Sequence, residues 1–177
     1  MKRAIALLEK HNLLKIISDE LDINLEIPHI AYVEVKRPDS KAILFTNVVD
    51  RKNSKKFKEP VLMNVFCNED AVKLFIGDGD KIGSEIESLL KLKPPVTFSE
   101  KLSTLGKLFS LKNTIPKKLN KKGECQEVIK LGADAKLSDL PVLTTWEEDG
   151  GPFITMGQVY TQSLNGELKN LGMYRLQ

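Results

Sequence analysis

The chain has 177 residues, enough to bury a sizeable hydrophobic core in one domain, or in one small domain and part of a second. Hydrophobic residues make up 41% of it and charged residues 29%, which is typical of a globular protein. The chain has 27 basic and 24 acidic residues, and so a net charge of only +3. This small charge argues against binding to nucleic acid or to membrane surfaces through overall charge.

Cysteine usage and hydropathy bear on the compartment of the protein. Cys67 and Cys125 stand far apart and belong to no CxxC or Cys/His spacing, so we expect reduced thiols rather than a disulfide framework or a zinc site. No apolar run approaches the roughly 20 residues of a membrane-spanning helix. The apolar stretch at 4–8 is cut short by Glu9 and Lys10, which favours an amphipathic helix over a signal peptide. We therefore expect a cytoplasmic protein without a membrane span.

The N-terminal part of the chain predicts two helices. Apolar residues recur close to helical spacing at 3–17 and predict a surface helix that packs one stripe of side chains. A second helix is expected after Asn24, since Pro28 is tolerated in the first turn of a helix. The residues expected to be buried on this second helix are Ile27, Ile30 and Val33.

Two short apolar runs predict strands. AILFT at 42–46 and VLMNVF at 61–66 have the length of strands, and their nearly continuous apolar character is typical of strands buried on both faces. A polar, lysine-rich connection separates them. Together with the helices, these runs predict a mixed α and β domain in which helices cover a small sheet.

Helix start signals follow the second strand. Asn68 is a predicted N-cap, with two acidic residues in the first turn, for a helix that ends near residue 76. Asp80 opens another helix that ends near residue 90. A third helix is predicted at 100–109, with a partly irregular segment as the alternative.

The stretch at 112–123 (KNTIPKKLNKKG) reads as an exposed connection because it combines Pro, Gly and Asn with five lysines. It is the predicted boundary between an N-terminal domain at 1–111 and a second domain at 124–177. Binding of nucleic acid by these lysines is the alternative to a solvated loop, but no aromatic residue is interleaved with them. We expect no nucleic-acid partner.

The C-terminal segment predicts a β-hairpin. A strand is expected at 125–129, followed by alternating strands at 153–162 and 168–176. Between the last two strands lies Asn165-Gly166, and both residue types accept the positive φ angles of a type I′ turn. The chain therefore ends, in this reading, in a hairpin that enters a larger β structure.

Polar side chains are dense on this predicted hairpin. Asn170 offers a neutral amide oxygen of the kind that hard cations prefer, and Arg175 offers a charged fork for a carboxylate or phosphate. The two residues point to opposite faces of a regular strand, so a shared site requires a bulge or bend, for which Gly172 is suited. The alternative is a set of ordinary outward-facing strand residues, and the acidic run at 147–149 is typical of a solvated turn.

A long run at 140–177, LPVLTTWEEDGGPFITMGQVYTQSLNGELKNLGMYRLQ, closely resembles UbiD-type decarboxylases. The shared pattern is LP, a Trp followed by acidic residues, GGPxIT, and a hairpin that ends in NxGxYRxQ. LEKHNLLKIISDELDINLEIPHIA at 8–31 resembles the opening helix of the family, and AILFT and VLMNVF stand at matching places. The chain is identified as a member of this family over essentially its whole length.

The resemblance implies reversible, non-oxidative decarboxylation of aromatic or α,β-unsaturated carboxylic acids. Enzymes of this family use prenylated FMN, supplied by a flavin prenyltransferase, with Mn2+ and K+ at its phosphate, and ubiquinone biosynthesis is one of the family's uses. The implied fold class is α+β, in which an N-terminal mixed α/β domain is followed by the beginning of a flavin-reductase-like split β-barrel.

The family's functional residues carry over onto the NxGxYR motif of the hairpin. The resemblance makes Asn170 a manganese ligand, and Met173, Tyr174 and Arg175 the residues that line the flavin. Arg175 would also hold the substrate carboxylate within an acid/base network that includes two downstream glutamates. Thr155, from the GPxIT segment, would approach the cofactor, and Met173 replaces the commoner Ile.

Full-length relatives continue past this hairpin, and their later part supplies further metal ligands and the proton-donating acid. We therefore expect a chain that is incomplete and inactive alone. The alternatives are a truncated, non-catalytic fragment and one chain of a split enzyme that is completed by a complementing C-terminal chain. An unpaired edge on the last strand predicts self-association into a homo-oligomer.

Overall fold

The computed structural model describes residues 1–91 and 120–177. The chain divides into two compact units. Met1–Ile76 and Lys136–Gln177 together form the first unit, and Gly77–Ala135 forms the second. The helix predicted at 100–109 and most of the connection predicted at 112–123 lie outside the described residues. The domain boundary at that connection therefore stays a prediction.

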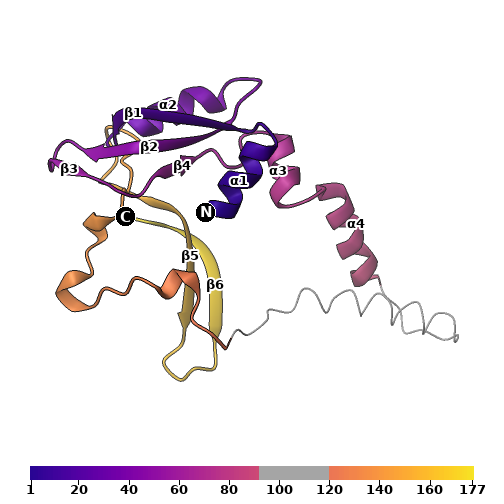
Figure 1. Ribbon diagram of the computed structural model, residues 1–177. Helices are drawn as coiled ribbons and strands as arrows, with labels where there is room; N and C mark the ends of the chain where they lie inside the picture. The colour runs from indigo at the N-terminus through magenta and orange to yellow at the C-terminus, as the bar shows by residue number, and fades with distance from the viewer. Residues whose placement is uncertain (92–119) are drawn as a thin grey trace, which may run out of the picture. The chain divides into compact units, whose positions relative to one another are not determined.

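A four-stranded sheet forms the centre of the first unit (Figure 1). Its central strand β2 pairs in parallel with β1 and antiparallel with β3 and β4. The strands are β1 (Leu14–Asp22), β2 (Ala42–Asp50), β3 (Lys55–Lys56) and β4 (Val61–Met63). Because β1 and β2 run in the same direction, the chain must cross over between them, and helix α2 (Glu26–Val35) makes this crossover.

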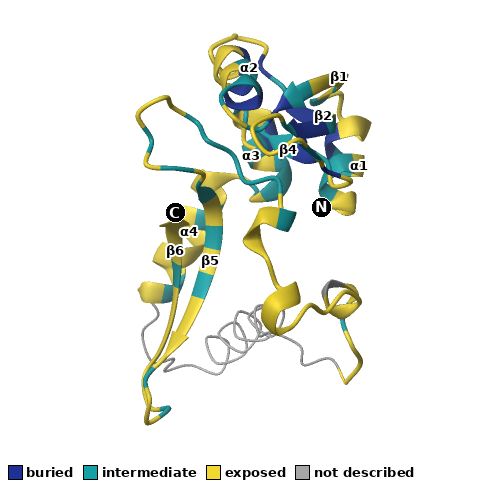
Figure 2. Ribbon diagram, turned by 90° about the vertical axis from the view of Figure 1, so that its left-hand side faces the viewer, coloured by how far each residue is buried: buried dark blue, intermediate teal, exposed yellow. Residues whose placement is uncertain are grey.

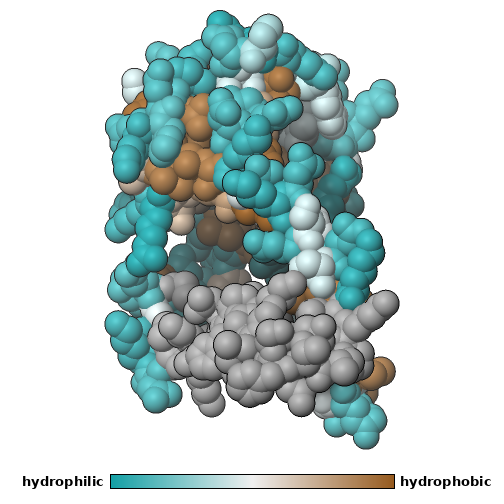
Figure 3. Space-filling model, turned by 90° about the vertical axis from the view of Figure 1, so that its right-hand side faces the viewer, coloured by the Kyte–Doolittle hydropathy of each residue, from teal (hydrophilic) through white to brown (hydrophobic). Residues whose placement is uncertain are grey.

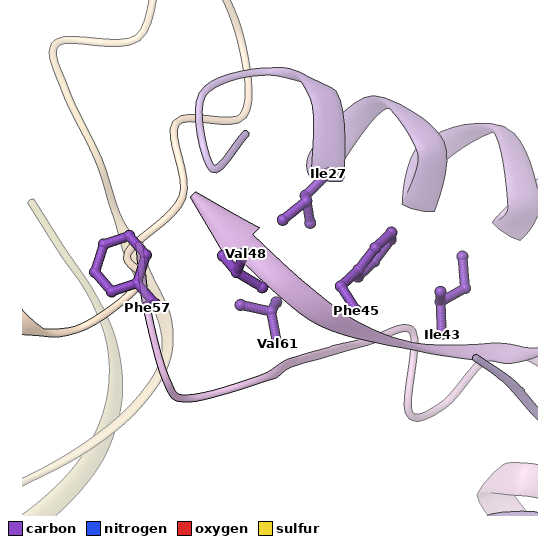
Figure 4. Packing of buried hydrophobic residues seen from close by; sticks show 6 residues of the cluster. All are labelled: Ile27, Ile43, Phe45, Val48, Phe57 and Val61. Carbon is purple, nitrogen blue, oxygen red and sulfur yellow. The ribbon is translucent and has the colours of Figure 1, made fainter. Parts of the chain in front are cut away.

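The core of this unit lies between α2 and the sheet. Figure 4 shows Ile43 and Phe45 of β2 pointing toward α2, which contributes Ile27. These three side chains are completely buried, and each contributes roughly 1.5–3 kcal/mol relative to an exposed position. The remaining members of the buried cluster are Val48, Phe57 and Val61.

The opposite face of the sheet is covered by α1 (Lys2–Lys10) and α3 (Glu69–Phe75). Leu8 of α1 and Ala71 of α3 are fully buried. The cover is incomplete, because Ile16 of β1 remains 56% exposed. Figure 3 shows hydrophobic side chains gathered on one face of the molecule at the height of this sheet.

The structure corrects the first N-terminal helix prediction and confirms the second as α2. The helix predicted at 3–17 ends at Lys10, and β1 begins at Leu14 after a turn in which Asn12 has a φ of 57°. Pairing with β2 overrides the helical spacing, since the backbone N–H of Ala42 donates to the carbonyl of Leu13 at 3.0 Å. On α2, Ile27 is buried as predicted, but Val33 is 52% exposed.

The caps of the next helices follow the sequence closely. The side chain of Asn68 accepts a hydrogen bond from the backbone N–H of Ala71 at 2.9 Å, which confirms it as the N-cap of α3. In the second unit, α4 (Gly79–Leu90) is capped by Asp78 rather than opened by Asp80. The second predicted strand is shorter than expected, because β4 ends at Met63.

The prediction of a strand at 125–129 is wrong. A short 3₁₀ helix, η2 (Glu124–Gln126), stands there, and the backbone N–H of Gly123 donates to the side chain of Gln126 at 2.9 Å. Two further 3₁₀ turns are η3 (Gly132–Asp134) and η4 (Leu137–Asp139). This local hydrogen bonding replaces the ladder that a strand would need.

The C-terminal hairpin is confirmed as β5 (Ile154–Gln162) and β6 (Lys169–Leu176). Its turn is not type I′. That turn needs a positive φ at both central residues, and here Gly166 has a φ of 76° but the φ of Asn165 is not positive. The backbone N–H of Ser163 donates to the carbonyl of Leu168 at 2.9 Å and closes the loop. The hairpin thus uses a longer connection, in which glycine alone supplies the positive φ.

The predicted fold class is confirmed at the level of a mixed α and β protein with two sheets. The second sheet contains β5 and β6, and the described part of the chain closes no barrel. Within that same part, no helix has the length and apolar character needed to cross a lipid bilayer.

Candidate functional site

The hairpin presents two different faces. Its pairing is continuous from Gly157 opposite Tyr174 to Gln162 opposite Lys169, so side chains alternate regularly along β6. One face carries Asn170, Gly172 and Tyr174, and the other carries Leu171, Met173 and Arg175. Every one of these positions except Gly172 is exposed (Figure 2). The side chains of Asn170 and Arg175 therefore lie on opposite faces.

Asn170 and Tyr174 meet on the first face. The Asn170 Nδ2 donates to the Tyr174 hydroxyl at 3.4 Å, a long hydrogen bond. Gly172 makes this contact possible, because a Cβ atom at that position would collide with the Tyr174 ring. With Nδ2 directed at the tyrosine, the Oδ1 of Asn170 is the atom left to bind a cation.

Arg175 is held on the second face by an aromatic ring. Its guanidinium carbon Cζ lies 3.8 Å from the centroid of the Phe153 ring, a cation–π contact worth about 0.5–1 kcal/mol at an exposed position. Phe153 is in turn fixed to the preceding segment, since its backbone N–H donates to the carbonyl of Leu143 at 3.0 Å. The polar edge of the guanidinium is left to bind an anion.

A β-bulge lies on β5 and not at Gly172, where a shared site would have required it. The register shifts between Ile154 and Gly157, so Thr155 and Met156 together stand opposite Arg175. The structure therefore places Thr155 across from Arg175, and Asn170 beside Tyr174. It does not bring Asn170 and Arg175 onto one face.

The described residues alone do not complete a metal site. They include no group of three or more His, Cys, Asp or Glu side chains placed to hold a metal ion. A divalent cation such as Mg²⁺ or Ca²⁺ takes about six or more ligands, of which Asn170 offers one oxygen. A flavin fits the hairpin better, because Met173 is 71% exposed and Leu171 66% exposed beside the Arg175 guanidinium. These residues suit one side of such a group.

Sequence reasoning missed the role of Phe153. It was predicted only as an alternating strand residue, yet its ring is the platform on which the Arg175 guanidinium rests. An aromatic residue just before a strand that faces an arginine is a weak signal. The register of the hairpin, and with it the bulge, was needed to bring the two residues together.

Comparison with protein families assigns most of the chain. Residues 5–90 match the N-terminal domain of 3-octaprenyl-4-hydroxybenzoate carboxy-lyase, and residues 117–177 match the Rift-related domain of the same family. The chain belongs to the UbiD family. The second match contains the whole hairpin, and the first contains the four-stranded sheet.

Curated relatives match all or nearly all of the chain. An uncharacterized protein of Helicobacter pylori is 44% identical over 100% of this chain and 29% of its own length. An uncharacterized protein of Aquifex aeolicus is 38% identical over 96% of this chain and 34% of its own length. The UbiD-family chain thus spans about a third of the length of the relatives that it matches, and corresponds to their N-terminal part.

Solved structures share the fold. The UbiD-class enzyme HmfF of Pelotomaculum thermopropionicum, determined in complex with FMN, matches 99% of this chain and 34% of its own with a TM-score of 0.60 at 22% identity. The vanillic acid decarboxylase of Sedimentibacter hydroxybenzoicus, in its open form, matches 99% of this chain and 34% of its own with a TM-score of 0.63 at 19% identity. The arrangement of the sheet and the hairpin is therefore that of UbiD-class enzymes.

Proposed function

We propose that this chain supplies the N-terminal domain and the first cofactor-binding strands of a UbiD-type decarboxylase. The reaction is non-oxidative decarboxylation of aromatic or α,β-unsaturated carboxylic acids in the cytoplasm, with prenylated FMN, Mn2+ and K+. The observation that carries the proposal is the hairpin within the family match, on which Asn170 and Arg175 are both exposed and available to a ligand.

The two faces of the hairpin would have different roles in binding. Asn170 would give its Oδ1 to Mn2+, with Tyr174 holding the amide in place through the 3.4 Å hydrogen bond. Met173, Tyr174 and Arg175 would line the flavin, which would have to reach both faces of β6, and Thr155 would approach it from the bulge. The separation of the faces favours a metal and phosphate on one side of β6 and the substrate carboxylate on the other.

Arg175 is the residue of this chain proposed to act on the substrate. A guanidinium stays protonated throughout the physiological pH range, so it orients a departing carboxylate without giving up a proton. Stacking on Phe153 limits the freedom of the side chain and so reduces the entropy lost when it binds an anion. When bound, the prenylated flavin supplies the electron sink for the bond that breaks.

Activity requires more than these residues. A decarboxylase needs an acid to protonate the carbon that loses CO₂, and no Asp or Glu in the described part of this chain forms an ion pair with Arg175. We propose that the remaining barrel, its acid and the other metal ligands come from a further UbiD segment, and that the assembled protein is a homo-oligomer. A non-catalytic fragment is the second candidate, favoured because the described residues include no group of three or more His, Cys, Asp or Glu side chains that could hold a metal ion.

Co-expression tests the proposal. The chain would be produced with a flavin prenyltransferase, with and without a chain covering the remaining two thirds of the Aquifex relative. We expect the combination to be coloured, to contain manganese and to release CO₂ from a cinnamate-like or hydroxybenzoate-like acid. A colourless combination without manganese would contradict the proposal and favour the non-catalytic fragment.

The Arg175→Ala variant tests the assigned role within the active combination. We expect CO₂ release to fall at least a thousandfold, corresponding to about 4 kcal/mol of lost transition-state stabilisation. Arg175→Lys is the matched control, because it keeps the charge but loses the fork, and it should recover only part of the rate. Retained turnover in Arg175→Ala would refute the role.

A further inference from the structure

A cavity of about 550 Å³ lies away from the hairpin, between the start of α2 and the segment at 145–148. Both walls belong to the same compact unit. The helix contributes Pro28, His29 and Tyr32, and the facing segment contributes Trp146, Glu147 and Glu148. None of these residues has a part in the proposed decarboxylase site.

Backbone hydrogen bonds fix the two walls to each other. The N–H of Leu25 donates to the carbonyl of Thr144 at 3.0 Å, and the N–H of Thr144 donates to the carbonyl of Ile23 at 3.2 Å. Leu25 has a φ of 70°, a conformation that costs a leucine of order 1–3 kcal/mol and persists only where the surroundings impose it. The cavity is therefore built into the fold where α2 begins.

Two aromatic rings form the apolar part of the cavity. Tyr32 and Trp146 meet edge to face, with their ring centroids 5.5 Å apart at an interplanar angle of 76°. Trp146 is 54% exposed and Tyr32 44% exposed, so ring surface remains open to a ligand. Lys36 already lies with its Nζ 5.1 Å from the centroid of the Tyr32 ring, which shows that this ring accepts a cation on its face.

Two carboxylates stand at the rim without partners. Glu147 and Glu148 are exposed, and neither forms an ion pair or hydrogen bond within the described part of the chain. Asp149 differs, because its Oδ2 accepts the backbone N–H of Trp146 at 3.0 Å and so holds the turn. The cavity therefore combines an aromatic wall with two free negative charges.

We propose that this cavity is a docking site for an arginine side chain carried by a basic segment of a partner protein. A guanidinium stacks flat on an aromatic ring and donates a pair of hydrogen bonds to a carboxylate, so one arginine satisfies both features of the cavity. The half-exposed rings leave a wide mouth that would bury a small free ligand poorly, whereas a peptide backbone covers the rim. The site goes beyond the proposed decarboxylase function.

Trp146 makes the proposal directly measurable, because it is the sole tryptophan of the chain. The full chain would be titrated with the peptide acetyl-Ala-Arg-Ala-amide while Trp146 fluorescence is recorded, with acetyl-Ala-Glu-Ala-amide as the control. We expect a saturable change with the arginine peptide, weakened severalfold by 0.5 M salt because screening reduces charge attraction, and no change with the glutamate peptide. Equal responses to both peptides, or none to either, would overturn the proposal.

Variants that replace a glutamate by a neutral glutamine distinguish specific docking in the cavity from general charge attraction between the peptide and the protein. Glu147→Gln combined with Glu148→Gln should weaken arginine-peptide binding at least tenfold, whereas Glu124→Gln combined with Glu127→Gln removes the same charge elsewhere and should leave it unchanged. Equal weakening by both pairs would overturn the assignment. Circular dichroism of each variant checks that folding is intact, and Tyr32→Phe, which keeps the ring, should bind like the parent chain.

The source of the arginine is tested with the free ligand. Arginine amide at the same concentration should bind at least tenfold more weakly than the peptide, since it lacks the backbone that covers the rim. Equal affinity would overturn the assignment to a protein segment and indicate a site for a small cationic molecule.

Discussion

Strand β2 and the C-terminal hairpin both contain several large apolar residues but have opposite environments. Six of the residues of β2 are buried, among them Ile43 and Phe45, whereas no residue of β5 or β6 is buried. Figure 2 shows the contrast as dark blue in the sheet against yellow and teal in the hairpin. An isolated two-stranded hairpin is marginally stable in water, so most of the folding free energy resides in the sheet.

The exposed hairpin is also where the proposed chemistry lies. Asn170 and Arg175 gain little from packing, because each makes a single weak contact within the described chain. A ligand or a further β segment that covers the hairpin would bury Met173 and Leu171 and add the stability that the hairpin lacks. The residues that stabilise the fold are therefore distinct from the residues that are available to bind a ligand.

The largest expected effect is in the core. Phe45→Ala should lower the free energy of unfolding by about 3–5 kcal/mol, because the ring is fully buried between α2 and the sheet and its loss leaves a cavity. Urea denaturation followed by circular dichroism measures the change. Met173→Ala is the control from the hairpin and should alter stability by less than about 0.5 kcal/mol. Similar losses of unfolding free energy in the two variants would contradict the proposed difference in stability between the sheet and the hairpin.

A smaller effect is expected at the helix cap of α3. Asn68→Ala removes the acceptor for the backbone N–H of Ala71 and should cost about 1 kcal/mol, within a range of about 0.5–2. Asn68→Asp keeps this acceptor but loses the Nδ2 group that donates to the Ser40 carbonyl at 2.9 Å, so it should restore only part of the stability. Denaturant midpoints at constant slope measure both variants, and an unchanged midpoint in Asn68→Ala would show that the cap does not contribute.

The smallest effect concerns acid stability at the start of α2. The backbone N–H of Asp22 and the Arg51 guanidinium both donate to Glu26, at 2.8 and 2.5 Å, and hold the pKa of that carboxyl below its ordinary value. A carboxyl with a lowered pKa in the folded state stabilises the protein above about pH 4.3, and this contribution is lost as the pH falls through the folded pKa. The parent chain should therefore lose more stability between pH 5 and pH 3 than Glu26→Gln does.

Thermal melting across that pH range provides the measurement. Asp19→Asn, which removes a carboxyl for which no ion pair is recorded in the described chain, is the control and should follow the parent chain. Parallel curves for the parent and Glu26→Gln would contradict a stabilising role for the pair.

Local signals predicted much of the fold. The continuous apolar run of β2, the Asn68 cap and the alternating hairpin each depend on neighbours in the sequence, and each is confirmed. Strand β1 was missed because its pairing with β2 is distant in sequence and its spacing imitates a helix. The strand predicted at 125–129 failed because local 3₁₀ hydrogen bonds form there instead.

The geometry of the candidate site could be predicted only in part, and its residues remain a prediction. Side-chain alternation correctly predicted that Asn170 and Arg175 face opposite ways. The bulge fell at Thr155 and Met156 rather than near Gly172, since the register between two strands depends on both of them. Gly172 instead makes room for the Tyr174 ring, a role that only the side-chain positions reveal.

The most direct test of the two-faced hairpin compares Asn170→Ala with Arg175→Ala in the active combination of chains, by manganese content, flavin absorbance and CO₂ release. Asn170→Ala should lose most of the bound manganese, because its Oδ1 is the proposed ligand. Arg175→Ala should keep manganese and flavin but lose CO₂ release. Full manganese occupancy in Asn170→Ala would contradict the proposed role of this hairpin as a wall of the cofactor site.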